Sequence, residues 1–198
     1  MKILYNIYYR MKIYLLRHED RTQDCSFFSP LTHDGLENSV KLIEKLKECK
    51  INKIFCSPFI RTLQTIYPYS KEMNININIE YGLEEINHGD IIAPKNAGVH
   101  LPEYLAISFN YNSEYKSFIK PDMIVYPEKE CHVEKRIKRF LRNLITEYGN
   151  IDDNIILVTH QCVCLEILKI AKKKEDDYMK GMLSLVFDTN SGWIFEKI

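Results

Sequence analysis

The sequence lacks a net charge, a long apolar run and a secretion signal. Lys and Arg together number 27, as do Asp and Glu, so the protein as a whole offers no general attraction to nucleic acid or to an anionic membrane. No apolar stretch approaches the roughly 20 residues that a helix needs to span a bilayer. The first ten residues lack an apolar core followed by small residues. These absences predict a cytoplasmic protein that partners neither nucleic acid nor membrane and binds anions only locally.

The chain also lacks an internal repeat and a linker, and its 198 residues are the length of one domain. A hydrophobic content of 45% is ample for a core. Met11 opens a segment that repeats the first three residues of the chain and looks like a second start. We therefore predict that residues 1–10 are an N-terminal extension and that residues 11–198 form the domain.

Six cysteines in a chain without a secretion signal are expected to be reduced thiols rather than a disulfide framework. They are Cys25, Cys49, Cys56, Cys131, Cys162 and Cys164. Only Cys162 and Cys164, close behind His160, hint at a metal. Their spacing does not fit a zinc knuckle, and a helix there would splay the two side chains about 200° apart. We expect packing residues here and no metal.

Apolar patterns predict alternating strands and helices. Continuous apolar runs indicate buried strands at about 12–17, 53–56 and 154–159. Strict alternation over 74–79 indicates a strand with one solvent-exposed face, and the runs 183–187 and 193–198 suggest a terminal hairpin. Helices are expected at about 32–49, from Pro58 onward, at 129–148 and at 162–173. This order predicts an α/β three-layer sandwich, with a mostly parallel central sheet and helices on both faces.

Three details of this prediction concern the helices and the middle of the chain. The first helix should turn an apolar stripe inward, made of Leu36, Val40, Ile43 and Leu46. Ser57 should cap the second helix, with Pro58 at its first position. Residues 90–127 show no clear period and should form an irregular insertion with short helices over the sheet edge.

Cations and imidazoles follow three of the predicted strands. Arg17 and His18 end the first, Arg61 follows the second within a helix's first turn, and His160 ends the third long run. Parallel sheets gather ligands at the carboxyl ends of their strands. Two arginines and two histidines gathered there predict a pocket for a phosphoryl group.

The chemistry of phosphate ester transfer assigns roles to these residues. An imidazole such as His18 can attack phosphorus without first losing a hydroxyl proton. Arg17 and Arg61 offer planar forks that match phosphate oxygens, and His160 adds a further donor. An acid must protonate the leaving oxygen, and Glu84 and Glu85 are both candidates.

Taken singly, each of these residues has an ordinary explanation. An isolated arginine or glutamate is usually solvated, and an isolated histidine is usually a satisfied structural residue. We assign no role to the remaining histidines, His33, His88, His100 and His132.

The motifs in order resemble the histidine phosphatases, the phosphoglycerate mutase-like superfamily. The matching pieces are Leu16-Arg17-His18, Pro30-Leu31-Thr32 with Gly35, Cys56-Ser57-Pro58 with Arg61 and Gln64-Thr65, Leu83 with Glu85 and Gly89, and Val158-Thr159-His160. The resemblance implies a phosphoglycerate mutase-like fold, a phosphohistidine on His18 and phosphate contacts from Arg17, Arg61 and His160. It implies Glu85 as proton donor, because the family has leucine two residues before the acid and glycine four after it. We expect no cofactor and no metal, because arginines and histidines supply the charge stabilisation that a metal would otherwise give.

Two positions depart from the family pattern. Glu19 and Gln161 stand where the family usually has glycine after each histidine. The segment after His18 resembles a subgroup that includes protein-tyrosine and steroid-phosphate phosphatases, and that resemblance implies Arg21 as an extra phosphate contact.

Three functions remain open at this point: a phosphatase, which we favour, a phosphoglycerate mutase-type phosphotransferase, and a catalytically inactive phosphate-binding module. The expected partner is a small phosphorylated substrate. Aromatic residues of the insertion could favour an aryl phosphate or phosphotyrosine, although core packing explains such residues as well. They are Tyr104, Phe109, Tyr111, Tyr115 and Phe118.

Overall fold

The computed structural model describes residues 11–24, 26–87, 100–149, 152–171, 183–188 and 196–197. Its centre is a six-stranded sheet in the order β3-β2-β4-β1-β5-β6. The strands are β1 (Lys12–Arg17), β2 (Lys53–Cys56), β3 (Ile77–Ile79), β4 (Asn154–Thr159), β5 (Leu183–Asp188) and β6 (Glu196–Lys197). The first four are parallel to one another, β5 runs antiparallel to β1, and β6 runs antiparallel to β5.

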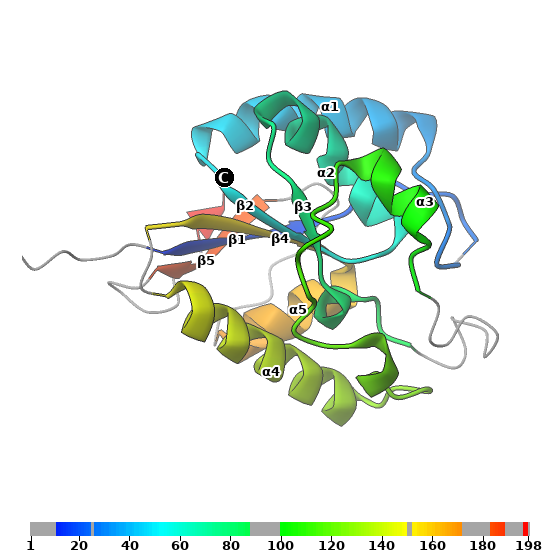
Figure 1. The fold of residues 1–198 in the computed structure, drawn as a ribbon, viewed down its shortest axis with the longest axis vertical. Coiled ribbons are helices and arrows are strands. Elements are labelled where there is room, and N and C mark those ends of the chain that lie inside the picture. Colours follow the sequence, from blue (N-terminus) through cyan, green and yellow to red (C-terminus); the bar gives the residue numbers. More distant parts are fainter. Residues whose placement is uncertain are drawn as a thin grey trace, which may run out of the picture.

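Helices cover both faces of this sheet. They are α1 (His33–Glu48), α2 (Ile60–Met73), α3 (Glu103–Ala106), α4 (Glu130–Tyr148) and α5 (Gln161–Ile170), with short 3-10 turns η1 (Tyr81–Leu83), η3 (Ile107–Phe109) and η4 (Pro121–Met123). Helices α1 and α2 lie on one face, and α4 and α5 lie on the other (Figure 1). The predicted three-layer α/β fold is therefore confirmed. None of the helices in the described part of the chain is long and apolar enough to cross a membrane.

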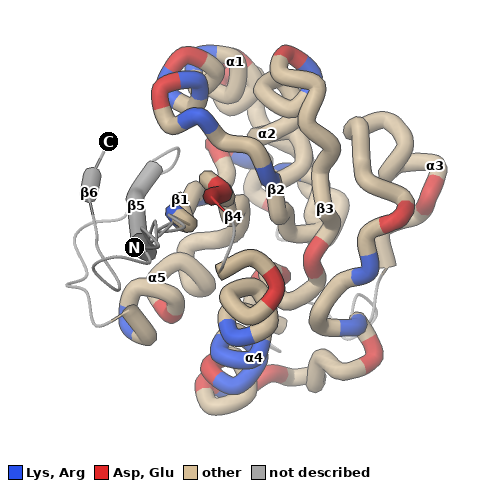
Figure 2. Tube along the Cα trace, turned by 60° about the vertical axis from the view of Figure 1, so that its left-hand side comes forward, with Lys and Arg blue, Asp and Glu red and all other residues tan. Residues whose placement is uncertain are grey.

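Alternate residues of the central strands supply two separate cores. In β1, Tyr14 and Leu16 pack in the core that α1 and α2 close. Ile13 and Leu15 point the other way, into the core of α4 and α5. Because β1 is buried on both faces, its sequence is continuously apolar over residues 13–16, as expected for an inner strand. Charged residues of both signs gather on α1 and α4 instead (Figure 2).

The predicted inward face of α1 is right for Leu46, which is buried, and for Ile43, which packs against the core, but wrong for Leu36 and Val40. Thr32 caps the helix as expected, accepting a hydrogen bond from Gly35 N at 3.1 Å. Leu36 and Val40, however, are 44% and 55% exposed, and the buried side instead comprises Gly35, Ser39, Leu42 and Leu46. A Cβ on Gly35 would lie 2.1 Å from the Asp20 carbonyl oxygen. Small residues therefore face the neighbouring loop here, where an apolar side chain has no room.

Two further boundaries differ from the prediction. Helix α2 begins at Ile60 after Phe59, so neither Ser57 nor Pro58 starts it. The strand expected over 74–79 is reduced to Ile77–Ile79. Helix α2 ends at Asn74, which adopts a left-handed backbone with φ 53°. The end of the helix therefore includes a position that the alternating pattern predicts to be strand.

The solvent-exposed face expected on that strand is also absent. Asn78 is only 8% exposed and its side-chain oxygen accepts a hydrogen bond from the Asn112 amide at 2.9 Å. The described part of the predicted insertion, residues 100–127, contains α3 and the two 3-10 turns that follow it. It lies along the edge strand, where Tyr111 forms a parallel bridge with Ile77. This segment closes the open edge of the sheet.

The remaining elements match the sequence patterns. Helix α4 buries its predicted apolar stripe, Val133, Ile137, Phe140, Leu141 and Leu144. Strands β5 and β6 pair antiparallel as the predicted terminal hairpin, whose connecting residues are outside the described part. The predicted extension 1–10 is also outside it.

Candidate active site

The carboxyl ends of β1, β2 and β4 bring the predicted site residues together. Arg17 pairs with Thr159 across β1 and β4, so His18 and His160 leave adjacent strands side by side. Their ring centroids are 5.3 Å apart. A cavity of about 600 Å³ opens beside His18, and its lining residues are Arg17, His18, Asp20, Arg21, Thr22, Gln23 and Thr32.

His18 is held in one tautomer by its own backbone. Its Nδ1 lies 2.7 Å from the carbonyl oxygen of Glu19, which can only accept, so Nδ1 carries the proton and Nε2 keeps its lone pair. Burial, together with the positive charges of Arg61 and Arg17, lowers the pKa of His18 to about 3. The imidazole is therefore neutral near pH 7 and has a free nucleophilic nitrogen.

His160 is completely buried and is oriented by a serine. Its Nε2 lies 2.8 Å from Ser57 Oγ, and its ring packs edge-on against Phe59 at 4.8 Å between centroids. Burial first, and then the charge of Arg61, lowers its pKa well below the usual value. The sequence pattern predicts Ser57 as a helix cap and does not predict this contact with His160. The available signal was its position directly after β2, equivalent to that of His18 after β1.

Arg61 is a buried cation and not a solvated one. It is 2% exposed, donates from Nη1 to the carbonyl of Ser26 at 3.0 Å, and lies with Cζ 4.5 Å above the ring of Phe59. It occupies the first turn of α2, as expected, so its charge adds to that of the helix N-terminus. Its Nη2 lies 4.0 Å from Oε2 of Glu85.

Of the two candidate acids, Glu85 is the one that reaches His160. Its Oε2 lies 3.6 Å from Nδ1 of His160, whereas the side chain of Glu84 accepts from the amide of Asn87 at 3.5 Å. Burial raises the pKa of Glu85, with Arg61 opposing the effect, and burial raises the pKa of Glu84 to about 8. Both carboxyls thus retain a proton more readily than usual, but only Glu85 has a position suited to donating it into the site.

Arg21 lies on the wall of the same cavity as His18. Its Nη1 donates to the carbonyls of Thr22 at 2.7 Å and Asp24 at 3.2 Å, which fixes the loop after β1. Asp20 is a lining residue that the sequence did not single out, and its Oδ2 accepts from the hydroxyl of Thr32 at 3.0 Å. The cavity wall is therefore polar and of mixed charge.

The two departures from the family pattern occupy different environments. Glu19 is buried, and its N–H donates to the hydroxyl of Thr65 at 3.0 Å. Its side chain is not part of the cavity lining. Gln161 is exposed at the first position of α5.

None of the other described histidines and cysteines lines the cavity beside His18. His33 is exposed beside Glu37, His132 accepts from the backbone of Lys129, and the ring of His100 lies 5.9 Å from that of Tyr81. His88 and Cys25 are outside the described residues. Cys162 is exposed and Cys164 is buried, and across the described ranges no group of three or more His, Cys, Asp or Glu could hold a metal ion. The five described cysteines are free thiols.

Four of the five aromatic residues of the insertion make packing contacts. Tyr115 donates to Glu80 at 2.6 Å, Phe118 stacks on Phe55, and Phe109 packs against Tyr67. Tyr111 lies partly buried against the core of α1 and α2, and Tyr104 is 73% exposed. None of the five belongs to the lining of the cavity beside His18.

The pKa shifts predict a distinctive pH profile. Neutral His18 is present above its pKa of about 3, and protonated Glu85 is present below its raised pKa. For an ester with a poor leaving group, kcat/KM should therefore rise through about pH 3 and fall only above the range of an ordinary glutamate, near 4.3. The measurement is a pH–rate profile corrected for the second ionisation of the substrate. A falling limb that persists unchanged in Glu85→Gln would contradict the assignment.

Known proteins share this fold and sequence pattern. The family model described as histidine phosphatase superfamily (branch 1) matches residues 13–183. No curated protein matches the sequence. Ecdysone phosphate phosphatase from Bombix mori, solved with tungstate, gives a TM-score of 0.68 at 13% identity, covering 95% of this chain and 92% of that one. A mycobacterial glucosyl-3-phosphoglycerate phosphatase gives 0.65 at 15% identity, covering 94% and 97%. Alpha-ribazole phosphatase from Shigella flexneri gives 0.59 at 20% identity, covering 88% and 89%.

Proposed function

Because the chain belongs to the histidine phosphatase superfamily, we propose that it hydrolyses phosphate monoesters through a phosphohistidine on His18. The observation that carries this proposal is the meeting of three groups at one edge of the sheet. A neutral His18 with a free Nε2 lies beside buried Arg61 and within the same cluster as Glu85, whose pKa is raised. These are a nucleophile, a charge that stabilises phosphate oxygens, and an acid.

In the first step, Nε2 of His18 attacks phosphorus while the bond from phosphorus to the ester oxygen breaks. Arg17 and Arg61 bind the equatorial oxygens, and Glu85 gives its proton to the departing oxygen. We include Arg21 as a further phosphate contact, since it lies on the same wall. In the second step, water attacks the phosphohistidine, Glu85 takes up the proton of that water, and inorganic phosphate leaves.

His160 contributes a hydrogen bond to the transferred phosphoryl group. A Ser57 hydroxyl that donates to Nε2 leaves the imidazole proton on Nδ1, the nitrogen that faces Glu85. Nδ1 is buried and makes no hydrogen bond to the described residues. A phosphate oxygen in the site would satisfy it, as buried donors require.

The substrate class follows from the site and from the similar structures. Those structures are of phosphatases named for ecdysone phosphate, glucosyl-3-phosphoglycerate and alpha-ribazole, which supports a small phosphorylated substrate. The described cavity wall is polar, and the insertion aromatics pack elsewhere. A preference for aryl phosphate or phosphotyrosine therefore stays a prediction that the described wall does not favour.

Further parts of the proposal concern the chain as a whole. We assign residues 11–198 to the phosphatase domain and place residues 1–10 outside it. We also propose that the protein is cytoplasmic and that neither nucleic acid nor a membrane is its partner. The chemistry needs no metal, since arginines and histidines supply the charge stabilisation. A phosphoglycerate mutase would have to exclude water from its phosphohistidine between the two transfers. An inactive module would bind phosphate without turnover.

Turnover of p-nitrophenyl phosphate tests the proposal. The protein should release phosphate catalytically, and EDTA should leave the rate unchanged. With 3-phosphoglycerate, release of phosphate supports a phosphatase, whereas isomerisation without release identifies a mutase. Binding of inorganic phosphate with no turnover of any ester would establish the inactive module. Strong inhibition by EDTA would revive a metal site at Cys162 and Cys164.

A further inference from the structure

The segment that carries Glu85 has little regular structure of its own. It follows the short turn η1, and residues 84–87 adopt neither helix nor strand. From the sheet, the hydroxyl of Thr159 donates to the carbonyl of Leu83 at 2.6 Å. Further fixation must come from outside the segment, because a free loop would not hold one carboxyl within reach of His160.

Arg136 supplies the hydrogen bonds on one side of Glu85. It extends from α4, and its side chain is only 5% exposed. Its Nη1 donates to the carbonyl of Gly82 at 2.9 Å and to that of Glu84 at 3.1 Å. The second of these carbonyls belongs to the peptide unit that leads into Glu85.

Glu128 supplies the hydrogen bonds on the other side. Its Oε2 accepts from the backbone N–H of Asn87 at 3.0 Å, and its own N–H donates to the carbonyl of Asn87 at 2.9 Å. Glu128 thus fixes the residue two positions after Glu85, as Arg136 fixes the residue immediately before it.

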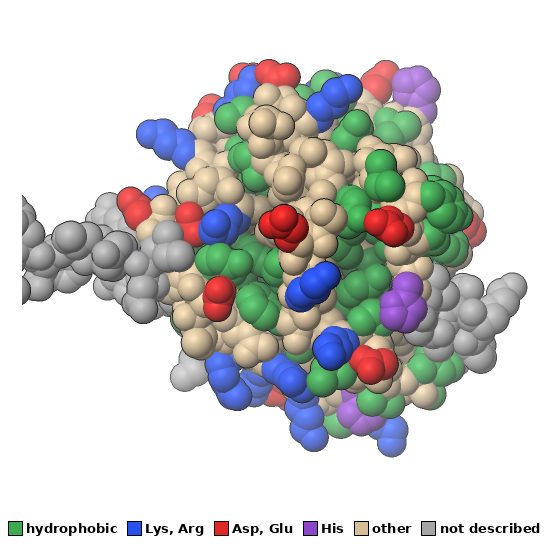
Figure 3. All heavy atoms as spheres, viewed as in Figure 1, with side chains coloured by type: hydrophobic (Ala, Val, Ile, Leu, Met, Phe, Trp, Pro, Cys, Tyr) green, Lys and Arg blue, Asp and Glu red, His purple; other side chains and the backbone are tan. Residues whose placement is uncertain are grey.

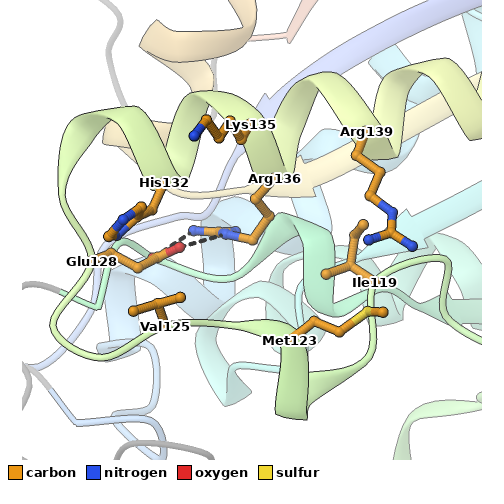
Figure 4. A pocket seen from close by; sticks show the side chains of 8 residues that line it. All are labelled: Ile119, Met123, Val125, Glu128, His132, Lys135, Arg136 and Arg139. Carbon is orange, nitrogen blue, oxygen red and sulfur yellow. Dashed lines mark hydrogen bonds and ion pairs between the residues drawn. The ribbon is translucent and has the colours of Figure 1, made fainter.

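The two side chains also hold each other. Arg136 donates from Nε to Oε1 of Glu128 at 2.9 Å and from Nη2 to Oε2 at 2.8 Å, and the side chain of Glu128 is 1% exposed. Figure 4 shows them pointing toward one another beside a cavity of about 210 Å³. Only a guanidinium can form this fork and also reach both carbonyls. Other Lys and Arg side chains gather at the surface over α4, in contrast (Figure 3).

We propose that Arg136 and Glu128 are positioning residues for the acid step, holding the segment 84–87 so that the Glu85 carboxyl faces the leaving oxygen. This inference rests on the proposed phosphatase function. Buried ion pairs contribute little net stability but can fix one geometry. A small displacement of a catalytic group can cost about a hundredfold in rate, so a buried pair that sets this geometry would have a kinetic effect.

The test compares two substrates in Arg136→Lys, which keeps the charge and loses the fork. For glycerol phosphate, whose leaving group needs a proton, kcat/KM should fall about tenfold, and for p-nitrophenyl phosphate by less than about threefold. The ratio of the two rates on one sample does not depend on the fraction of folded enzyme. In a Glu85→Gln background, Arg136→Lys should have no further effect on that ratio. Arg139→Lys, an exposed position on the same helix, is the matched control.

Equal losses on both substrates, or a change in the ratio that persists without the Glu85 carboxyl, would overturn the proposal. Should Arg136→Lys fail to fold, Glu128→Gln carries the same test, because an amide keeps an acceptor for Asn87 and loses the charge. A wild type without turnover would end the proposed function. If the wild type turns over and Glu85→Gln changes the ratio, but neither Arg136→Lys nor Glu128→Gln does, only this inference would end.

Discussion

Replacing His18 with alanine is expected to lower kcat for phosphate esters by at least about a thousandfold, because no described group can replace its Nε2 as nucleophile. The structure gives that nitrogen a fixed direction through the bond from Nδ1 to the Glu19 carbonyl. The fold should persist, since His18 follows the end of β1 and its truncation leaves both sheet cores intact. Steady-state turnover and a melting curve are the measurements. His33→Ala, on the exposed surface of α1, is the control for a generic loss of histidine.

The covalent intermediate provides an independent measurement of the same prediction. Quenching the wild type during turnover should trap an acid-labile, alkali-stable phosphoryl group on His18. The label should be absent from His18→Ala. Label on Ser57 or on a cysteine would show that the nucleophile has been misassigned.

Replacing Glu85 with glutamine is expected to slow esters with poor leaving groups by about a hundredfold or more. The amide keeps the size of the side chain but has no proton to give to the departing oxygen. Turnover of p-nitrophenyl phosphate should change far less, because its phenolate departs without much protonation. Leaving-group dependence measured over a series of esters checks this.

Glu84→Gln is the matched variant, since it removes a neighbouring buried carboxyl whose oxygen is bonded to the Asn87 amide. It should leave the leaving-group dependence unchanged. The reverse outcome, with the effect in Glu84→Gln and none in Glu85→Gln, would show that Glu84 is the acid and that Glu85 is not.

Sequence patterns predicted the fold wherever a segment determines its own structure. β1 and β4 are apolar between their end residues because both faces are buried, and α4 repeats its apolar residues at helical spacing. His18 and His160 could be singled out for the same reason, because each directly follows such a strand. The carboxyl ends of parallel strands meet at one edge of the sheet, so the sequence alone predicts that the candidate pocket lies at that edge.

Contacts between distant segments could not be predicted in this way. Gly35 faces inward because the Asp20 backbone passes close to it, and no periodicity within α1 encodes that approach. Ser57 has the local features of a helix cap, and its bond to His160 joins two different strands. Arg136 lies among other cations on α4, and its role depends on carbonyls of the segment after β3.

β1, which leads into the proposed nucleophile His18, is the first of the described strands to be synthesised, but its neighbours in the sheet come much later. β1 lies between β4 and β5, and the N–H of His18 donates to the carbonyl of Thr159 at 3.0 Å. Ribosomes extend a chain at about 5–20 residues per second, so β1 emerges several seconds before either partner strand exists. A nascent chain that ends before β4 contains His18 but neither His160 nor the two strands that pair with β1. Phosphatase activity should therefore appear only late in synthesis, when the C-terminal strands insert on both sides of β1.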